Sequence, residues 1–86
     1  MEKEVVRDIE KYNKTLNDAN TGDVIKVYKI DTKEKSKLRK LMVFGIFEGV
    51  EIKLTQKFPV NIIQVGFTQV ALDKEVSSII KIEKQK

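Results

Sequence analysis

Apolar and polar residues alternate most regularly between residues 50 and 55. In the run Val50-Glu51-Ile52-Lys53-Leu54-Thr55 every second residue is aliphatic, which predicts a strand with one buried and one solvent-facing side. Residues 24–30 are rich in β-branched and aromatic side chains and predict an earlier strand, with a bulge or bend because the apolar positions change phase. Further strands are predicted at 62–67, 70–72 and 80–82, with Pro59 before the first of them and a bend at Gly66.

An amphipathic helix is predicted between the first two strands. Leu38, Leu41 and Met42 are spaced at i, i+3 and i+4, so they form one apolar stripe that we expect to lie against a sheet edge. The basic residues of the segment fall off this stripe. The N-cap is predicted at Asp31 or Ser36, and the helix is expected to end at Gly45, where a residue without Cβ can take the left-handed conformation.

These elements predict a mainly β fold, a small β-barrel of about five strands with an inserted amphipathic helix and a short helical turn before the last strand. Asp73 caps that turn, which is predicted to run through Ser77. A chain of 86 residues has room for one core. We expect the domain to span residues 16–82. Residues 1–15 are expected to be a weak helix or disordered arm, and 83–86 a disordered tail. Residues 50–55 could form an exposed edge that pairs across a dimer.

Composition excludes many kinds of chemistry. The chain has no cysteine and no histidine, so disulfides, Cys/His zinc sites, thiol nucleophiles and Ser/His/Asp hydrolysis are excluded. No glycine-rich phosphate loop is present, and the carboxylates do not follow the EF-hand pattern. We therefore expect a protein that is not an enzyme and has neither a cofactor nor a dedicated metal site.

Basic residues are concentrated in one short segment. The net charge is +4, and residues 33–40 contain five basic residues against one acidic residue, Glu34. Such a cluster is either a solvated helix face or a contact for nucleic acid, an acidic protein or an anionic membrane surface. The N-terminus does not resemble a signal peptide, and no apolar run is long enough to span a membrane. We expect a cytoplasmic protein.

The aromatic residues are scattered along the chain. Tyr28, Phe44, Phe47, Phe58 and Phe67 form no clustered run like that of an RNA-binding sheet, so core packing is predicted for most of them. Phe44 and Phe47 flank Gly45 beside the basic segment, and these two could instead form an exposed apolar knob.

From Leu16 onward the order of glycines and aliphatic residues resembles the FeoA family of bacterial ferrous iron uptake. The resemblance covers about four fifths of the chain. Two positions depart from the family pattern, because Phe44 replaces a usual aliphatic residue and Glu48 replaces a common proline. The matching features are Leu16, Gly22-Asp23, Leu38-x-x-Leu41-Met42, Gly45-Ile46, Gly49-Val50-x-Ile52, Gly66, Val70-Ala71-Leu72-Asp73 and Ile80-x-Ile82.

This resemblance implies an SH3-like barrel that works without catalysis. It also implies an accessory or regulatory subunit that acts on ferrous iron transport protein B, a membrane GTPase, at the cytoplasmic part of that transporter. The same module occurs as the C-terminal domain of metal-dependent repressors. No catalytic residue follows from the resemblance.

Our hypothesis for the partner-binding site is the inserted helix together with the turn after it. There a local excess of positive charge coincides with two aromatic residues, and arginine and aromatic side chains are enriched among interface anchors. Two other functions stay open. One is a nucleic-acid-binding barrel that uses the same basic segment. The other is an SH3-like peptide adaptor, although a chain without tryptophan has few aromatic residues to form the groove that such an adaptor needs. The predicted contact surface consists of Lys37, Arg39, Lys40, Phe44 and Phe47.

Overall fold

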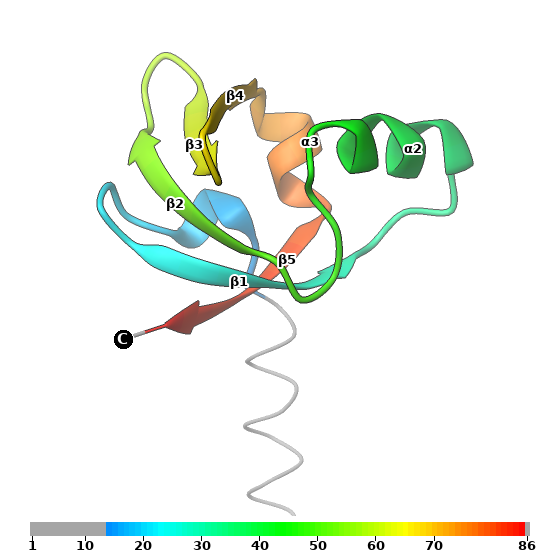
Figure 1. The fold of residues 1–86 in the computed structure, drawn as a ribbon, viewed down its shortest axis with the longest axis horizontal. Helices are drawn as coiled ribbons and strands as arrows, with labels where there is room; N and C mark the ends of the chain where they lie inside the picture. The colour runs from blue at the N-terminus through cyan, green and yellow to red at the C-terminus, as the bar shows by residue number, and fades with distance from the viewer. Residues whose placement is uncertain (1–13, 86) are drawn as a thin grey trace, which may run out of the picture.

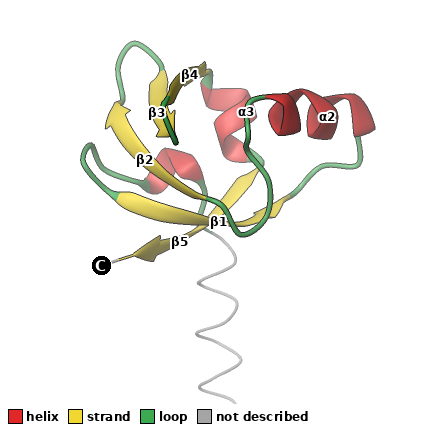
Figure 2. Cartoon of the chain, viewed as in Figure 1, coloured by secondary structure: helices red, strands yellow, loops and turns green. Residues whose placement is uncertain are grey.

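The structure, a computed structural model, describes residues 14–85, which form one antiparallel sheet with three short helical segments (Figures 1 and 2). The predicted mainly β architecture with an inserted helix is confirmed. The strand order in the sheet is β4-β3-β2-β1-β5. The elements are η1, a 3-10 helix (Leu16–Asp18), β1 (Val24–Ile30), α2 (Lys35–Val43), β2 (Glu51–Gln56), β3 (Asn61–Val65), β4 (Thr68–Leu72), α3 (Lys74–Ser78) and β5 (Ile80–Gln85).

The core is aliphatic and lies inside the curved sheet. In β2 the alternating side chains Ile52 and Leu54 are buried while their neighbours face solvent, as the period of two predicts. The bulge predicted in β1 is present, because the register with β5 shifts between Val27 and Lys29. The buried hydrophobic residues are Leu16, Ala19, Ile25, Val27, Ile30, Leu41, Ile46, Ile52, Leu54, Ile63, Val70, Leu72, Ile80 and Ile82.

The edges of the sheet differ from the prediction. Residues 50–55 are not an exposed edge, because β2 lies between β1 and β3 and pairs with both. The edge strands are β4 and β5. A single strand's alternation shows which side is buried but not which strands lie beside it, so this error has a simple cause. Within residues 14–85, β5 receives backbone contacts from residues 14–15 on its outer side, whereas β4 has no partner strand on its outer side.

Strand β5 forms the C-terminal end of the domain and also contacts its N-terminal end. The tail prediction was wrong for residues 83–85, which continue β5 and pair with β1. At the other end, the amide N of Ile82 donates a hydrogen bond to the carbonyl O of Lys14 over 3.0 Å, and Thr15 forms a β-bridge with Lys81. Residues 1–13 of the predicted N-terminal extension lie outside the described residues. The part of the extension at 14–15 therefore packs on the barrel.

A buried polar network connects three elements at one end of the barrel. Asn61 at the start of β3 is fully buried, and its Nδ2 donates hydrogen bonds to Oδ1 of Asn17 over 2.9 Å and to Oγ of Ser77 over 2.8 Å. Nδ2 of Asn17 donates to the carbonyl O of Lys74 over 3.0 Å. Since buried polar groups are costly without partners, this network fixes how η1 and α3 sit against β3.

The C-terminal end of α2 is set by Gly45, as predicted. Gly45 has a φ of +85°. Its N–H donates to the carbonyl O of Met42 over 2.9 Å, and the N–H of Ile46 donates to the carbonyl O of Leu41, also over 2.9 Å. This pair of hydrogen bonds is a Schellman motif, which favours glycine at the left-handed position. It turns the chain sharply, so that Ile46 enters the core.

Replacing Gly45 with alanine is expected to destabilise the domain more than the same change at Gly49. Both glycines have positive φ, so either alanine costs about 1 kcal/mol in backbone strain. A Cβ at Gly45 would in addition lie 3.2 Å from Cγ1 of Val65, whereas a Cβ at Gly49 meets no atom within 4 Å. Chemical denaturation of the two variants measures the difference. Equal losses would show that the contact with Val65 relaxes freely.

Candidate partner-binding surface

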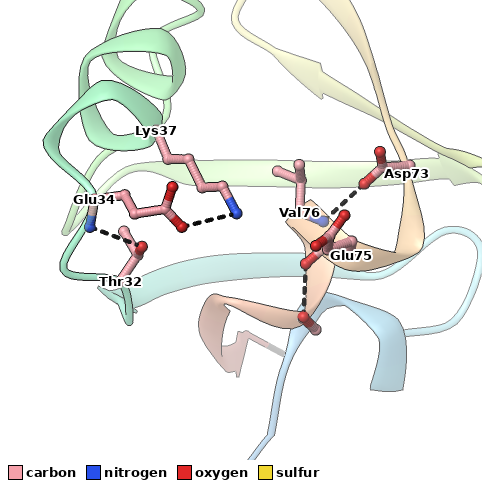
Figure 3. Close-up of polar contacts among 7 residues, drawn as sticks. Thr32, Glu34, Lys37, Asp73, Glu75 and Val76 are labelled. Atoms are coloured by element: carbon pink, nitrogen blue, oxygen red, sulfur yellow. Dashed lines mark hydrogen bonds and ion pairs between the residues drawn. The ribbon is translucent and has the colours of Figure 1, made fainter.

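Helix α2 begins without a side-chain cap. The predicted N-caps Asp31 and Ser36 were wrong: Glu34 is the N-cap residue, with extended backbone, and the helix starts at Lys35. The N–H of Glu34 instead donates to Oγ1 of Thr32 over 3.1 Å, which orders the turn before the helix (Figure 3). The spacing of residues in the sequence is compatible with several helix starts, and the turn that Thr32 and Glu34 form places the start at Lys35.

Only one narrow face of α2 packs against the rest of the domain. Leu41 is buried and Leu38 is partly buried against the core. Met42, which the apolar stripe placed with them, is 62% exposed, so this part of the prediction was wrong. The nine-residue helix projects from the barrel (Figure 1), and the side of it that carries Met42 is exposed to solvent. Val43 is also exposed.

A groove of about 290 Å³ lies where α2 faces α3 and the end of β4. Three of the five residues of the predicted contact surface, Lys37, Lys40 and Phe44, line it, whereas Arg39 and Phe47 are exposed but do not. Figure 3 shows Lys37 reaching from α2 toward Val76 and Asp73. The remaining lining residues are Leu41, Ala71, Leu72, Asp73 and Val76.

The charges of the groove are unequally distributed between its two sides. On the α2 side, Nζ of Lys37 lies 3.3 Å from Oε2 of Glu34, in an ion pair exposed enough to contribute little to stability. On the other side Asp73 caps α3, and its Oδ1 accepts a hydrogen bond from the N–H of Val76 over 2.7 Å. The α2 side is therefore cationic, and the apolar floor lies between two polar walls.

The phenylalanines do not pack in the core. Phe44, Phe47, Phe58 and Phe67 are 38%, 47%, 75% and 105% exposed. The prediction of core packing was therefore wrong for Phe58 and Phe67, while the exposed knob that the sequence allowed at Phe44 and Phe47 is present. The physical reason is that aliphatic side chains fill the barrel interior and each phenylalanine lies outside the strands, in a turn, a loop or the helix C-cap. Over Phe58, Nζ of Lys74 lies 5.3 Å from the ring centroid.

Sequence reasoning missed part of the exposed apolar surface around the end of α2. Met42 and Val43 extend it along the helix. Phe67 occupies the β3–β4 turn, which starts next to Val65, the residue that Gly45 approaches. The signal available in the sequence was the position of Phe67 directly after Gly66, a turn residue, because side chains at hairpin turns face solvent.

No group of three or more His, Cys, Asp or Glu side chains among residues 14–85 is arranged to hold a metal ion. In the same part of the chain no helix has both the length and the hydropathy required to cross a bilayer.

Comparison with solved structures places the fold among SH3-like FeoA proteins. A FeoA-like protein from Clostridium acetobutylicum is 27% identical with a TM-score of 0.71, covering 81% of this chain and 84% of that one. An iron uptake regulatory protein (FeoA) is 24% identical with a TM-score of 0.75, covering 81% and 93%. The FeoA of Stenotrophomonas maltophilia, a prokaryotic SH3 domain protein complexed with zinc, is 24% identical with a TM-score of 0.63, covering 84% and 89%.

A family model gives the assignment from sequence. No curated protein sequence matches the chain significantly. The model of the FeoA domain, however, matches residues 14–84, which include every strand and helix described above except the last residue of β5, Gln85. The five-stranded SH3-like fold and this match agree. The chain therefore belongs to the FeoA family, which is associated with ferrous iron transport.

Proposed function

We propose that this protein is a non-catalytic cytoplasmic accessory protein of ferrous iron uptake that binds the cytoplasmic part of ferrous iron transport protein B. Membership of the FeoA family supplies the link to ferrous iron transport. The S. maltophilia FeoA has been described as a candidate activating factor for that transport. An accessory role fits a small domain whose polar groups mostly face solvent.

The observation that carries the proposal is the groove between α2 and α3. It brings Lys37, Lys40 and Phe44 together at one concave surface with an apolar floor. Interfaces combine such a desolvated apolar centre with a charged or polar rim. Arg39 lies outside the groove on the same helix, where it can add long-range attraction.

The arrangement of aromatics does not favour a nucleic-acid-binding barrel. Base stacking on a barrel of this kind needs aromatic side chains on a strand face among cations. Within residues 14–85 the strands carry a single aromatic side chain, Tyr28 on β1, which is partly buried, whereas Phe58 and Phe67 lie beyond opposite ends of β3. The basic segment remains suited to an acidic protein surface.

Co-purification tests the proposal. Tagged ferrous iron transport protein B, solubilised in detergent from membranes of cells that express the full chain, is expected to retain it in a stoichiometric complex. A transporter variant without its cytoplasmic GTPase domain is the matched control and is expected to lose the chain. Absence of the chain from the intact transporter, with both proteins folded and present, would contradict the proposal.

A further inference from the structure

Strand β4 has one side without a partner strand. It pairs with β3 through the register Val65↔Thr68 to Asn61↔Leu72, and it is the last strand in the sheet order of the described residues. The loop between the two strands, Gly66-Phe67, has two residues, and the residues that flank such a loop form a hydrogen-bonded pair. Bonded and non-bonded pairs then alternate along the ladder.

This alternation determines which backbone groups of β4 face outward. Gln69 and Ala71 fall in the non-bonded pairs with β3, so their N–H and C=O groups point away from the sheet. Both residues are exposed, and within residues 14–85 the structure gives them no backbone hydrogen bond outside the strand. An open edge of this kind is a template for another extended segment.

The open edge runs into the groove. Ala71 lies on β4 and lines the groove together with Leu72, and the opposite side is formed by Leu41 of α2 and by Phe44, the C-cap residue of that helix. The concave surface is thus bounded by an edge strand on one side and by a helix on the other. Peptide-binding domains that use strand addition take affinity from the strand's backbone groups and specificity from side-chain pockets beside it.

The charge of the residues that line the groove indicates what kind of segment binds there. Two lysines of α2, Lys37 and Lys40, line the groove against one acidic residue, Asp73, so the lining has an excess of positive charge, which lies on the α2 side. We infer that the groove binds an extended acidic segment of the partner, which adds to the open edge of β4 and inserts one apolar side chain between Leu41 and Val76. This inference rests on the proposed function, because it names the part of the transporter that docks.

Peptides from the transporter test the inference. Overlapping twelve-residue peptides that cover the cytoplasmic segments of ferrous iron transport protein B are titrated into the ¹⁵N-labelled full chain. The peptides that bind are expected to be net acidic and to slow hydrogen exchange at the amides of Gln69 and Ala71 at least tenfold. Backbone N-methylation of a binding peptide at the residues that face β4 is expected to abolish binding, whereas methylation at the intervening residues leaves it intact.

A pair of charge-reversal variants separates the groove from net charge. The variant K37E/K40E is expected to bind the acidic peptide at least tenfold more weakly. The variant K33E/K35E has the same net charge, and its affinity for the peptide is expected to change less than threefold because neither residue lines the groove. Binding of the intact transporter is measured in parallel. The inference is overturned if the transporter binds while no peptide protects Gln69 and Ala71, or if the two variants weaken binding equally. If the transporter itself does not bind, the proposed function fails first.

Discussion

Replacing Asn61 with alanine is expected to lower the free energy of unfolding by about 3 kcal/mol, because each buried polar group left without a partner costs about 1–3 kcal/mol. The change removes the hydrogen bonds to Asn17 and Ser77 and leaves the buried hydroxyl of Ser77 without this donor. Oδ1 of Asn61 is buried and has no hydrogen-bond partner among the described residues, so the cost comes from the two bonds that Nδ2 donates. A domain of this size has a total stability of about 4–13 kcal/mol. The loss is therefore a large fraction of it, and urea denaturation followed by circular dichroism measures it.

Gln64 on the same strand is the matched control. Its side chain is exposed, and among the described residues its amide Nε2 donates one hydrogen bond, to the carbonyl O of Gly66 over 3.1 Å. Gln64→Ala is expected to change stability by less than about 0.5 kcal/mol, as exposed substitutions usually do. A comparable loss from both variants would show that the network around Asn61 contributes no more than an ordinary surface contact.

Replacing Lys37, Arg39 and Lys40 together with glutamate is expected to weaken binding to the cytosolic domain of ferrous iron transport protein B at least 100-fold. The substitution reverses the charge along α2 while leaving Leu38 and Leu41 in place, so the fold is preserved. A 100-fold change corresponds to about 2.8 kcal/mol, which is typical of losing a few interfacial charged contacts. Isothermal titration calorimetry measures the change.

Lys26, Lys29 and Lys53 provide the control for this triple variant. They are exposed on β1 and β2, and none of them lines the groove, so their reversal to glutamate gives the same net charge at a different place. Binding of this second variant is expected to fall less than threefold. Unchanged affinity of the α2 variant, with its circular dichroism spectrum intact, would exclude α2 as the contact.

The fold was largely predictable because it depends on local patterns. The alternation through Ile52 and Leu54, the cap at Asp73 and the stop at Gly45 each specify an element without reference to the rest of the chain. The neighbours of a strand depend instead on long-range pairing. For that reason the sequence predicts an edge position for β2 and an unstructured tail at the end of β5, and both predictions are wrong.

The candidate site was predictable only in part. Charge density identified α2, and three of the five predicted residues line the groove. The opposite wall comes from Ala71 to Val76, more than 25 residues away in sequence, and no local pattern joins it to α2. Exposure of Phe67 was missed because hydrophobicity alone predicts burial, whereas its position in a two-residue turn decides the outcome.

Calorimetric titration of the full chain into the purified cytosolic GTPase domain of ferrous iron transport protein B tests the central claim most directly. The titration is done at low and high salt, with and without guanine nucleotide. Saturable binding is predicted that weakens at high salt but persists, because the groove joins cationic and apolar contacts. No binding in any of these conditions, by a chain that also fails to bind the intact transporter, would contradict the account.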